Sequence, residues 1–295
     1  MSTARIVALI PTISPARITE AAPWIEGLSA HGIDVRVVAN AASVAASAAP
    51  PGARIIDSRS NPGFARSLTA ALGSVSEWDW VVLLNDDLLF GDETPARIRD
   101  AVASATSDVL LFDPEPARAV PRRREVFESL SLLEAAATRL RERGFPTALP
   151  RAGGDTYKSF SAVAISRAAW FETGGLDNRF VFCFEDAFFV RRYLNRGGIR
   201  PTSLDVGIAH KKSITTGRHI ARVLPAIAYS ARTYLEATGS HPRSADALVV
   251  AALLVRLALI PFACAPAGAH VHGVLRSLRA VVRRREPALP DYESL

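Results

Sequence analysis

The sequence predicts an α/β protein built on a mainly parallel sheet, followed by a helical C-terminal segment. In the first half, short apolar runs alternate with stretches of helical spacing. The runs 80–84 and 109–112 are apolar without interruption, as in strands that are buried on both faces. This alternation is typical of a doubly wound sheet with helices on both faces. After residue 216 the pattern becomes wholly helical.

The predicted elements follow one another with short connections. Strands are expected at 5–10, 35–38, 54–56, 80–84, 109–112, 160–165 and 206–209, and helices at 13–30, 64–75, 94–105, 130–143, 167–173, 223–236 and 245–262. A further helix is expected to begin at the acidic pair 185–186. The stretch 114–124 is rich in Pro and Arg and predicts a mobile surface loop.

Composition limits the classes of protein that the chain can represent. Its 295 residues are 49% apolar and 22% charged, which suits one large domain with a sizeable core. Cys183 and Cys264 are expected to be free thiols. The opening residues 1–12 have the pattern of a first strand and not of a secretory leader, so we expect a cytoplasmic protein.

The C-terminal segment carries most of the net charge of +6. From residue 217 onward there are ten arginines and five acids, which suggests an acidic partner surface or simply a solvated arginine-rich face. The helix 245–262 is about as long as a membrane span, but Arg256 lies in its middle and Pro261 near its end. We therefore expect it to pack on the domain or to lie in the membrane interface beside the basic segment 276–285.

Acidic residues follow the strand 80–84. Asn85, Asp86 and Asp87 come directly after it, and ligands of open α/β sheets bind beyond the carboxyl ends of the strands. Two adjacent carboxylates repel each other unless a cation lies nearby, and oxygen ligands favour Mg²⁺ or Mn²⁺. The alternative is that one of the two acids caps the following turn.

Two further motifs lie downstream. Glu185 and Asp186 end an aromatic stretch, where an apolar setting would raise the pKa of a carboxyl group and suit it to act as a base. His210 follows the strand 206–209 and precedes two lysines, so it could bind a metal beside a phosphate site. Taken singly, these motifs also fit a helix start and a structural histidine.

The order of the motifs is more specific than any one of them. Along the chain come Pro-Thr after the first strand, an Asn-x-Gly-Phe turn, Leu-Asn-Asp-Asp, Gly-Gly-Leu-Asp, Phe-Glu-Asp and a strand-terminal His. Over residues 4 to 236 this series resembles the family 2 inverting glycosyltransferases of GT-A fold, and most closely the rhamnosyltransferase-like branch that builds cell-surface polysaccharides. The resemblance implies a catalytic domain at 1–216, with a donor-binding half at about 1–113 and an acceptor half at about 114–216, and a helical extension at 217–295.

The resemblance also implies roles for individual residues. Asp186 would be the catalytic base, and Glu185 would hold the acceptor or orient its loop. Asp87 and His210 would bind the metal, Mg²⁺ or Mn²⁺. The residues implied in binding the nucleotide sugar are Pro11, Thr12, Asn61, Gly63, Phe64, Asn85 and Asp86. Lys211, directly after His210, could in addition face the phosphates of the donor.

One feature departs from the family pattern. The second strand commonly ends in an Asp that binds the base, whereas here Val38 is followed by Ala39 and Asn40. Asn40 or Asp57 is expected to take over base recognition, and dTDP- and UDP-sugars both stay open as donors. The acceptor would be a glycan, a lipid-linked glycan or a small-molecule natural product. Peripheral contact with the inner membrane face through the C-terminal helices and a homodimer are left open.

Three rival functions can be weighed from the same residues. A sugar nucleotidyltransferase or a dinucleotide-binding oxidoreductase should have a glycine-rich loop after the first strand, and residues 13–16 are not one. A non-enzymatic protein that binds an acidic surface would use the basic C-terminal helices. Nucleic acid is not expected as a partner, because the basic segment lacks the interleaved aromatic residues of single-strand binders.

Overall fold

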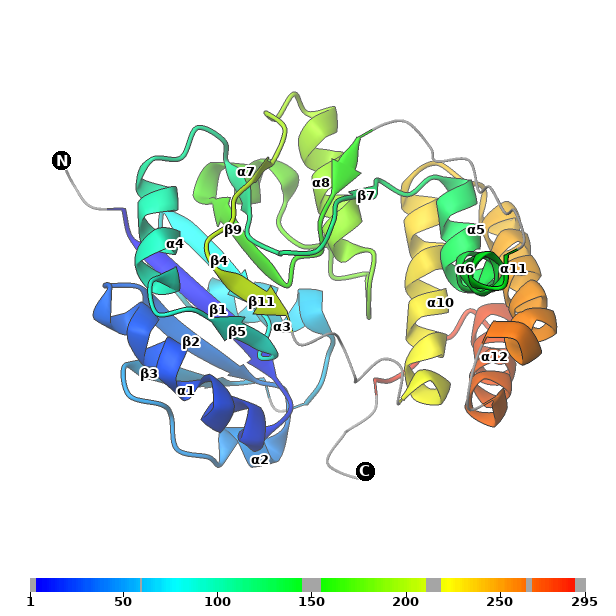
Figure 1. Ribbon diagram of the computed structural model, residues 1–295, viewed down its shortest axis with the longest axis horizontal. Coiled ribbons are helices and arrows are strands. Elements are labelled where there is room, and N and C mark those ends of the chain that lie inside the picture. Colours follow the sequence, from blue (N-terminus) through cyan, green and yellow to red (C-terminus); the bar gives the residue numbers. More distant parts are fainter. Residues whose placement is uncertain (1–3, 59, 145–154, 211–218, 264–266, 290–295) are drawn as a thin grey trace.

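The computed structural model describes residues 4–58, 60–144, 155–210, 219–263 and 267–289 (Figure 1). Its centre is a seven-stranded sheet of order β10-β6-β9-β4-β1-β2-β3. The strands are β1 (Ile6–Thr12), β2 (Asp34–Ala39), β3 (Ala53–Asp57), β4 (Trp80–Leu84), β6 (Val109–Leu111), β9 (Ala162–Ser166) and β10 (Thr202–Ser203). Only β9 runs antiparallel to its neighbours β4 and β6, and every other pairing in this sheet is parallel. The predicted mainly parallel sheet is confirmed.

Alternate residues of the central strands enter two different cores. In β1, Ala8 and Ile10 belong to the core on one face of the sheet, while Val7 and Leu9 belong to the core on the other. Successive side chains of a strand point to opposite faces, so a strand covered on both sides must be apolar throughout. This explains the uninterrupted apolar runs of β1 and β4.

Helices cover both faces of the sheet, as predicted. The first core contains residues of α1 (Pro15–Ala30), the short α2 (Ala42–Ala45) and α4 (Thr94–Ala103). The second contains residues of α3 (Phe64–Gly73), α7 (Arg167–Thr173) and α8 (Glu185–Asn195). The α/β class with helices on both faces is therefore confirmed.

Two short antiparallel pairs lie outside the main sheet. One joins β5 (Leu88–Phe90) to β11 (Ile208–His210), and the other joins β7 (Arg118–Ala119) to β8 (Thr156–Tyr157). The prediction of an irregular loop over 114–124 was wrong at β7, and also at residue 123, where a helix begins. The ladder partner of β7 lies far along the chain, so no local pattern indicates it.

A layer of helices lies beside the sheet domain (Figure 1). They are α5 (Arg123–Ser131), α6 (Leu133–Glu142), α10 (Ile220–Ala237), α11 (Pro242–Ala263) and α12 (Ala267–Val282). The predicted single helix at 130–143 is interrupted at Leu132, which adopts a left-handed φ of 65° between α5 and α6. Buried residues of α5, α10, α11 and α12 share one apolar core, so a segment from the middle of the chain packs with the C-terminal helices.

Helix α10 connects this layer to the sheet domain. The Ser230 hydroxyl accepts hydrogen bonds from the backbone N–H groups of Val181 and Phe182, each at 3.1 Å. The Tyr234 hydroxyl donates to the carbonyl of Pro121 at 2.8 Å. The helical layer therefore fixes the loop that leads into the acidic pair at the start of α8.

Candidate functional site

The carboxyl ends of the parallel strands gather chemically active residues at one edge of the sheet. Thr12 ends β1, Asn85 follows β4, and Asp113 comes shortly after β6. The antiparallel β9 begins at this edge, where the carbonyl of Ser161 accepts a hydrogen bond of 2.8 Å from the Asn85 N–H. The Ser161 hydroxyl also donates to the Asp113 carboxylate. This is the edge at which ligands of open α/β sheets bind.

Asp87 and His210 form a direct pair at this edge. In the β5–β11 ladder His210 lies opposite Leu88, the residue after Asp87, so the ladder brings together residues that are far apart in sequence. His210 Nε2 lies 3.1 Å from Asp87 Oδ1, and each side chain is 13% exposed. The hydrogen bond to Asp87 raises the pKa of His210 above its ordinary value. The other ring nitrogen, Nδ1, is buried without a partner among the described residues.

Asp86 lies in a more enclosed environment. Burial raises the pKa of its carboxyl group to about 6, against the opposing effects of a hydrogen bond from the Thr12 side chain and the charge of Arg17. The charge of Asp87 raises it further. The predicted Pro11-Thr12 and Asn85-Asp86-Asp87 segments therefore lie side by side at the ends of β1 and β4. The cluster brings two neighbouring carboxyl groups together, and a cation beside them would favour their ionised forms.

The donor set fits a magnesium or manganese ion only if the substrate supplies further ligands. Among the described residues, no group of three His, Cys, Asp or Glu side chains is placed to hold a metal. Asp87 and His210 provide one carboxylate and one imidazole. Mg²⁺ is commonly held by one or two carboxylates together with substrate phosphates and water. The two side chains present are therefore compatible with a metal that binds with a diphosphate.

Glu185 and Asp186 form a buried acidic pair at the start of α8. Burial, followed by the charge of Asp186, raises the pKa of Glu185 to about 8, and Glu185 Oε2 has no hydrogen-bond partner among the described residues. Burial also raises the pKa of Asp186 to about 6, although its Oδ1 accepts a hydrogen bond of 2.7 Å from the Ala187 N–H. Near neutral pH the pair therefore carries a proton on Glu185 and a negative charge on Asp186.

The backbone before this pair is strained. Cys183 and Phe184 have left-handed φ angles of 68° and 70°, which non-glycine residues rarely adopt. Two such residues in succession persist only where the surroundings hold them. Here Ser230 binds the two preceding N–H groups, and the Phe184 ring packs against Tyr234 with ring centroids 5.5 Å apart. The helical layer thus stabilises the conformation that presents the acids.

Sequence reasoning missed the segment that connects the two acidic centres. The charges of Asp113 and Glu115 both raise the pKa of His210. Glu115 also pairs with Arg118 at 2.9 Å, and the charge of Arg118 lowers the pKa of Asp186. Asp113 could have been found as another acid that follows a strand. Arg118 could not, because only the pairing of β7 with β8 brings it to Asp186.

Tyr157 is a second residue that local patterns did not indicate. It lies on β8 opposite Arg118. Burial, followed by the negative charge of Asp186, raises the pKa of its hydroxyl far above the ordinary value. The Tyr157 hydroxyl is therefore protonated throughout the physiological range and could donate a hydrogen bond beside Asp186.

The Asn61-Pro62-Gly63 turn lies against the loop before the acidic pair. Gly63 has a φ of 100°, and a Cβ atom there would lie 2.3 Å from the carbonyl oxygen of Val181. The turn is closed by a hydrogen bond of 3.4 Å from the Gly63 N–H to Asn61 Oδ1. Only glycine permits this close approach, so the two predicted motifs meet in the fold.

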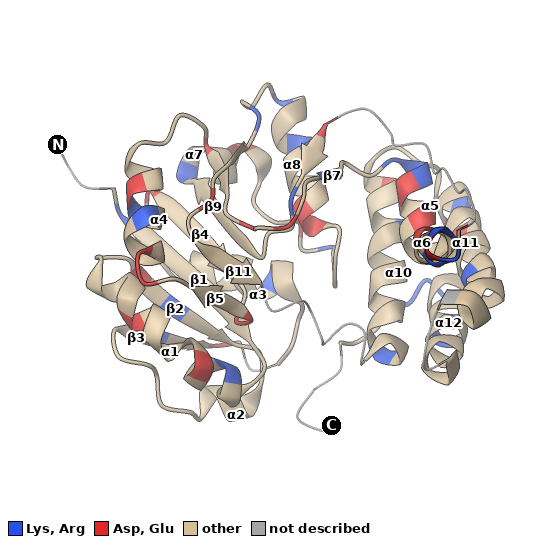
Figure 2. Cartoon of the chain, viewed as in Figure 1, with Lys and Arg blue, Asp and Glu red and all other residues tan. Residues whose placement is uncertain are grey.

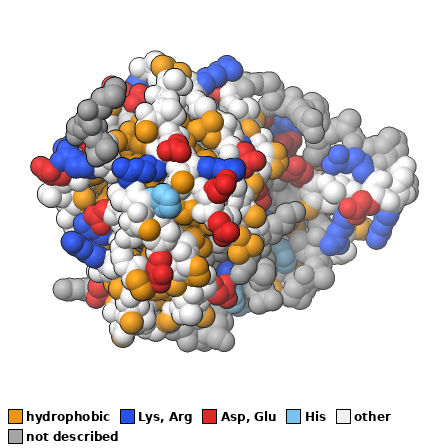
Figure 3. All heavy atoms as spheres, turned by 60° about the vertical axis from the view of Figure 1, so that its left-hand side comes forward, with side chains coloured by type: hydrophobic (Ala, Val, Ile, Leu, Met, Phe, Trp, Pro, Cys, Tyr) orange, Lys and Arg blue, Asp and Glu red, His pale blue; other side chains and the backbone are white. Residues whose placement is uncertain are grey.

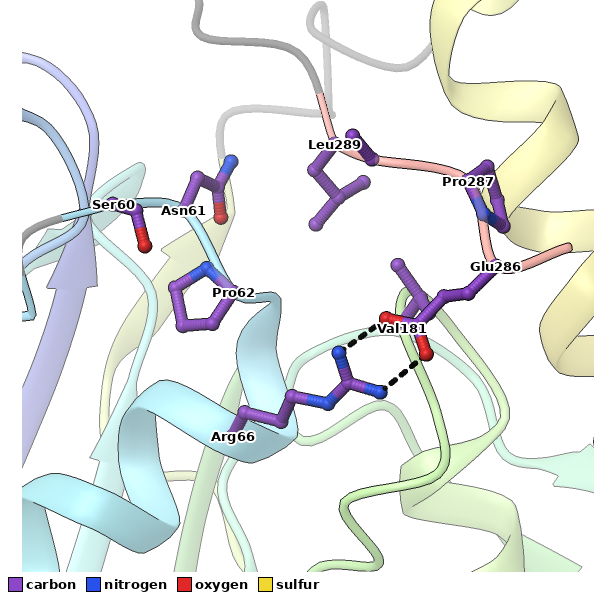
Figure 4. A pocket seen from close by; sticks show the side chains of 9 residues that line it. Ser60, Asn61, Pro62, Arg66, Val181, Glu286, Pro287 and Leu289 are labelled. Atoms are coloured by element: carbon purple, nitrogen blue, oxygen red, sulfur yellow. Dashed lines mark hydrogen bonds and ion pairs between the residues drawn. The ribbon is translucent and has the colours of Figure 1, made fainter.

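A cavity of about 310 Å³ opens beside this turn (Figure 4). Asn61 and Val181 line it, and the C-terminal segment contributes Glu286 and Leu289 to the lining. Arg66 of α3 donates two hydrogen bonds to the Glu286 carboxylate, one of 2.9 Å from Nη2 and a second from Nη1. The cavity thus lies where the chain's end meets the predicted nucleotide turn.

The remaining predicted residues have different surroundings. Asn40 is 5% exposed, and its amide group contacts the hydroxyls of Ser67 at 3.2 Å and Ser58 at 2.7 Å, so it braces the end of β2 against α3. Phe64 begins α3 and packs at the border of the second core. Lys211 lies outside the described residues.

The electrostatics of the sheet domain are mixed and not uniformly basic. Figure 3 shows one of its faces, on which acidic and basic side chains are interspersed.

Comparison with known proteins gives only a distant likeness. No family model matches the sequence, and no curated protein matches it. Among solved structures, S. aureus TarS residues 1–349 is 15% identical with a TM-score of 0.44, over 94% of this chain and 81% of that one. The same TarS fragment in complex with UDP-GlcNAc is 13% identical with a TM-score of 0.42, over 95% and 92% of the two chains. The functional conclusion therefore depends on the site's own geometry.

Proposed function

We propose that this protein is an inverting glycosyltransferase of GT-A type that transfers a sugar from a nucleoside-diphosphate donor to a hydroxyl acceptor. One observation carries the proposal. The Asp87–His210 pair and the buried Glu185–Asp186 pair are separate acidic centres, linked by the segment that contains Glu115 and Arg118. Glycosyl transfer with inversion needs both, because a leaving diphosphate requires cationic stabilisation and the acceptor hydroxyl requires a base.

Asp87 and His210 are the residues that would hold a divalent metal. When bound, Mg²⁺ or Mn²⁺ would neutralise the charge that develops on the leaving diphosphate. Asp86 and Thr12 would line the donor site beside this pair, because the Thr12 side chain at the end of β1 lies near enough to the Asp86 carboxyl group to lower its pKa. The turn at Asn61 would contact the nucleotide. We propose a dTDP- or UDP-linked hexose or deoxyhexose, such as rhamnose, as the donor.

Asp186 is the proposed base. It removes the proton of the acceptor hydroxyl as that oxygen bonds to the anomeric carbon, and the diphosphate departs from the opposite face with the electron pair of the broken bond. The configuration is thereby inverted. Glu185, protonated near neutral pH, leaves one negative charge on the pair, and Arg118 favours the ionised form of Asp186. Tyr157 can donate a hydrogen bond to the acceptor or to Asp186.

Asp186→Asn tests the role of the base. The substitution keeps the size of the side chain but removes the proton acceptor, so transfer should fall by about 10²- to 10⁴-fold. Binding of the nucleotide sugar, measured by calorimetry, should change little because Asp87 and His210 are untouched. The control is Asp100→Asn, which changes an exposed acid on α4. Transfer that survives Asp186→Asn with the correct acceptor would remove the assignment.

The metal role has its own test. Chelator should abolish transfer, and Mg²⁺ or Mn²⁺ should restore it. Asp87→Asn should raise the metal concentration that gives half-maximal activity by at least about tenfold, since it removes a first ligand. Calorimetry of nucleoside diphosphate binding with and without Mn²⁺ gives a readout that does not require the acceptor. Full activity in chelator would contradict the assignment.

We propose a glycan precursor as the acceptor, with lipid-linked forms included. Screening nucleoside diphosphates and their sugars by thermal shift, with and without Mn²⁺, identifies the donor first. Candidate glycan and small-molecule acceptors can then be compared with that donor. Transfer to a small-molecule natural product in preference to glycans would revise the acceptor class without changing the roles of Asp186 and Asp87.

A further inference from the structure

From residue 247 onward, the exposed residues of helix α11 are all apolar among the side chains that the structure describes. From residue 247 to its last described side chain, the exposed positions recur at helical spacing: Ala247, Ala251, Leu254, Ala258, Pro261 and Phe262. Leu254 is 52% exposed and Phe262 is 64% exposed. The outward face of a helix on a protein in water is normally polar, so an apolar outward face indicates a surface that contacts a binding partner or a membrane.

The single charge within the apolar part of α11 points inward. Arg256 is buried and donates hydrogen bonds to the carbonyl of Leu130 at 3.0 Å and to Nδ1 of His270 at 3.1 Å. Burial and the charge of Arg256 lower the pKa of His270, which keeps that nitrogen able to accept. α11 is long and apolar enough to cross a membrane. A membrane-spanning position would break these contacts, so α11 stays packed against the neighbouring helices and only its outward side is free to contact another surface.

Arginines flank the apolar face on the neighbouring helices. On α12, the exposed Leu275 and Val282 alternate with the exposed Arg276 and Arg279. These two arginines form no ion pair with another described residue, unlike Arg284, which pairs with Asp246 at 2.6 Å. Figure 2 shows basic positions along α6 and α12 beside α11.

Helix α6 extends the same composition. Its exposed end carries Leu140 between Arg139 and Arg141, and Arg139 donates a hydrogen bond of 3.4 Å to the carbonyl of Phe262. Of the eight exposed large hydrophobic side chains in the described part of the chain, five lie on these three helices: Leu140, Leu254, Phe262, Leu275 and Val282. Apolar groups and unpaired cations are thus concentrated in one layer of the molecule.

We propose that the surface formed by α6, α11 and α12 docks on an anionic lipid bilayer. The apolar side chains of α11 enter the boundary between headgroups and acyl chains, and the arginines of α6 and α12 contact the acidic headgroups. An anionic bilayer complements both parts of this surface. A polar protein surface would not bury the apolar side chains, and a neutral bilayer would not pair with the arginines. The proposal does not depend on the glycosyltransferase assignment.

Vesicle sedimentation of the full chain tests the proposal. The protein should bind vesicles of phosphatidylcholine with phosphatidylglycerol, bind vesicles of phosphatidylcholine alone much more weakly, and be released by salt. Each arginine near the surface is worth about fivefold in partitioning, so Arg276→Gln with Arg279→Gln should weaken binding by roughly 25-fold. Leu254→Ser with Phe262→Ser should weaken it by at least about tenfold for each side chain withdrawn from the interface.

Matched controls change equally exposed residues of the sheet domain. Ile199→Ser replaces an exposed apolar side chain, and Arg54→Gln with Arg196→Gln replaces exposed cations. These variants should bind vesicles as the unchanged chain does, and all variants should unfold at the same denaturant concentration. Equal binding by the α11 and control variants would overturn the proposal. So would a dimer, seen by light scattering, that Leu254→Ser with Phe262→Ser dissociates while no variant binds vesicles, because the face would then join two copies of this chain.

Discussion

Replacing Glu185 with glutamine should make the folded protein more stable near neutral pH. The Glu185 carboxyl group is buried at the start of α8, its Oε2 atom has no partner among the described residues, and its pKa is raised from 4.5 to about 8. A carboxyl group whose pKa is higher in the folded state holds its proton longer there than in the unfolded chain. Burial of Glu185 therefore leaves the free energy of unfolding undiminished below about pH 4.5. It lowers the free energy of unfolding progressively as the pH rises from there towards about 8.

The magnitude follows from the size of the pKa difference. At pH 7 the unfolded side chain is ionised, while the folded one is still mostly protonated. Keeping that proton costs about 1.4 kcal/mol for each pH unit above 4.5, or about 3 kcal/mol at pH 7. Glutamine needs no proton to be neutral, but its amide group must still be buried. The net gain expected for Glu185→Gln is about 1–2 kcal/mol, because burying the amide group offsets part of the cost of keeping the proton.

Urea unfolding from pH 5 to pH 8 measures the effect. The stability difference between Glu185→Gln and the unchanged chain should grow with pH across this window. Glu172→Gln, an exposed acid on α7, should show no such trend. A Glu185→Gln protein that is less stable than the unchanged chain at pH 7, or a stability difference between the two that does not vary with pH, would refute the conclusion that Glu185 is buried in its neutral form.

Two further predictions concern the same region. The turnover rate should rise with pH through about 6 as Asp186 ionises. Arg118→Gln should move the midpoint of this rise to higher pH, because the charge of Arg118 lowers the pKa of Asp186. A pH–rate profile that Arg118→Gln leaves unchanged would contradict the interaction between Arg118 and Asp186. Gly63→Ala should destabilise the protein by about 2–3 kcal/mol in urea unfolding, because its φ is 100° and its Cβ would meet the carbonyl of Val181. Gly73→Ala is the control, since a Cβ at the end of α3 has open space and should be neutral or slightly stabilising.

Strand ends could be predicted from the sequence because their signal is local. The run 80–84 is apolar on both faces, and the first polar residues after it must lie at the sheet edge. Asn85, Asp86 and Asp87 were placed correctly for this reason. The approach of His210 to Asp87 was expected only through the order of motifs, and the β5–β11 ladder supplies its physical cause.

The environment of the proposed base could not be predicted in the same way. Arg118 and Tyr157 reach Asp186 through a two-residue ladder between segments with no strand-like pattern of their own. The break at Leu132 is equally nonlocal, because the chain turns there so that both α5 and α6 pack against α11. Packing against a distant helix overrides the continuous helical periodicity that the sequence shows.

The helical layer connects stability to the proposed chemistry. Two consecutive left-handed residues, Cys183 and Phe184, would not hold their conformation without support, since each such residue costs on the order of 1–3 kcal/mol. Ser230 and Tyr234 of α10 supply that support from outside the sheet domain. A surface that anchors α11 and α12 on a bilayer would therefore also hold α10, and with it the loop that orients Asp186. The C-terminal helices are in this sense part of the site, although none of their residues carries the proposed chemistry.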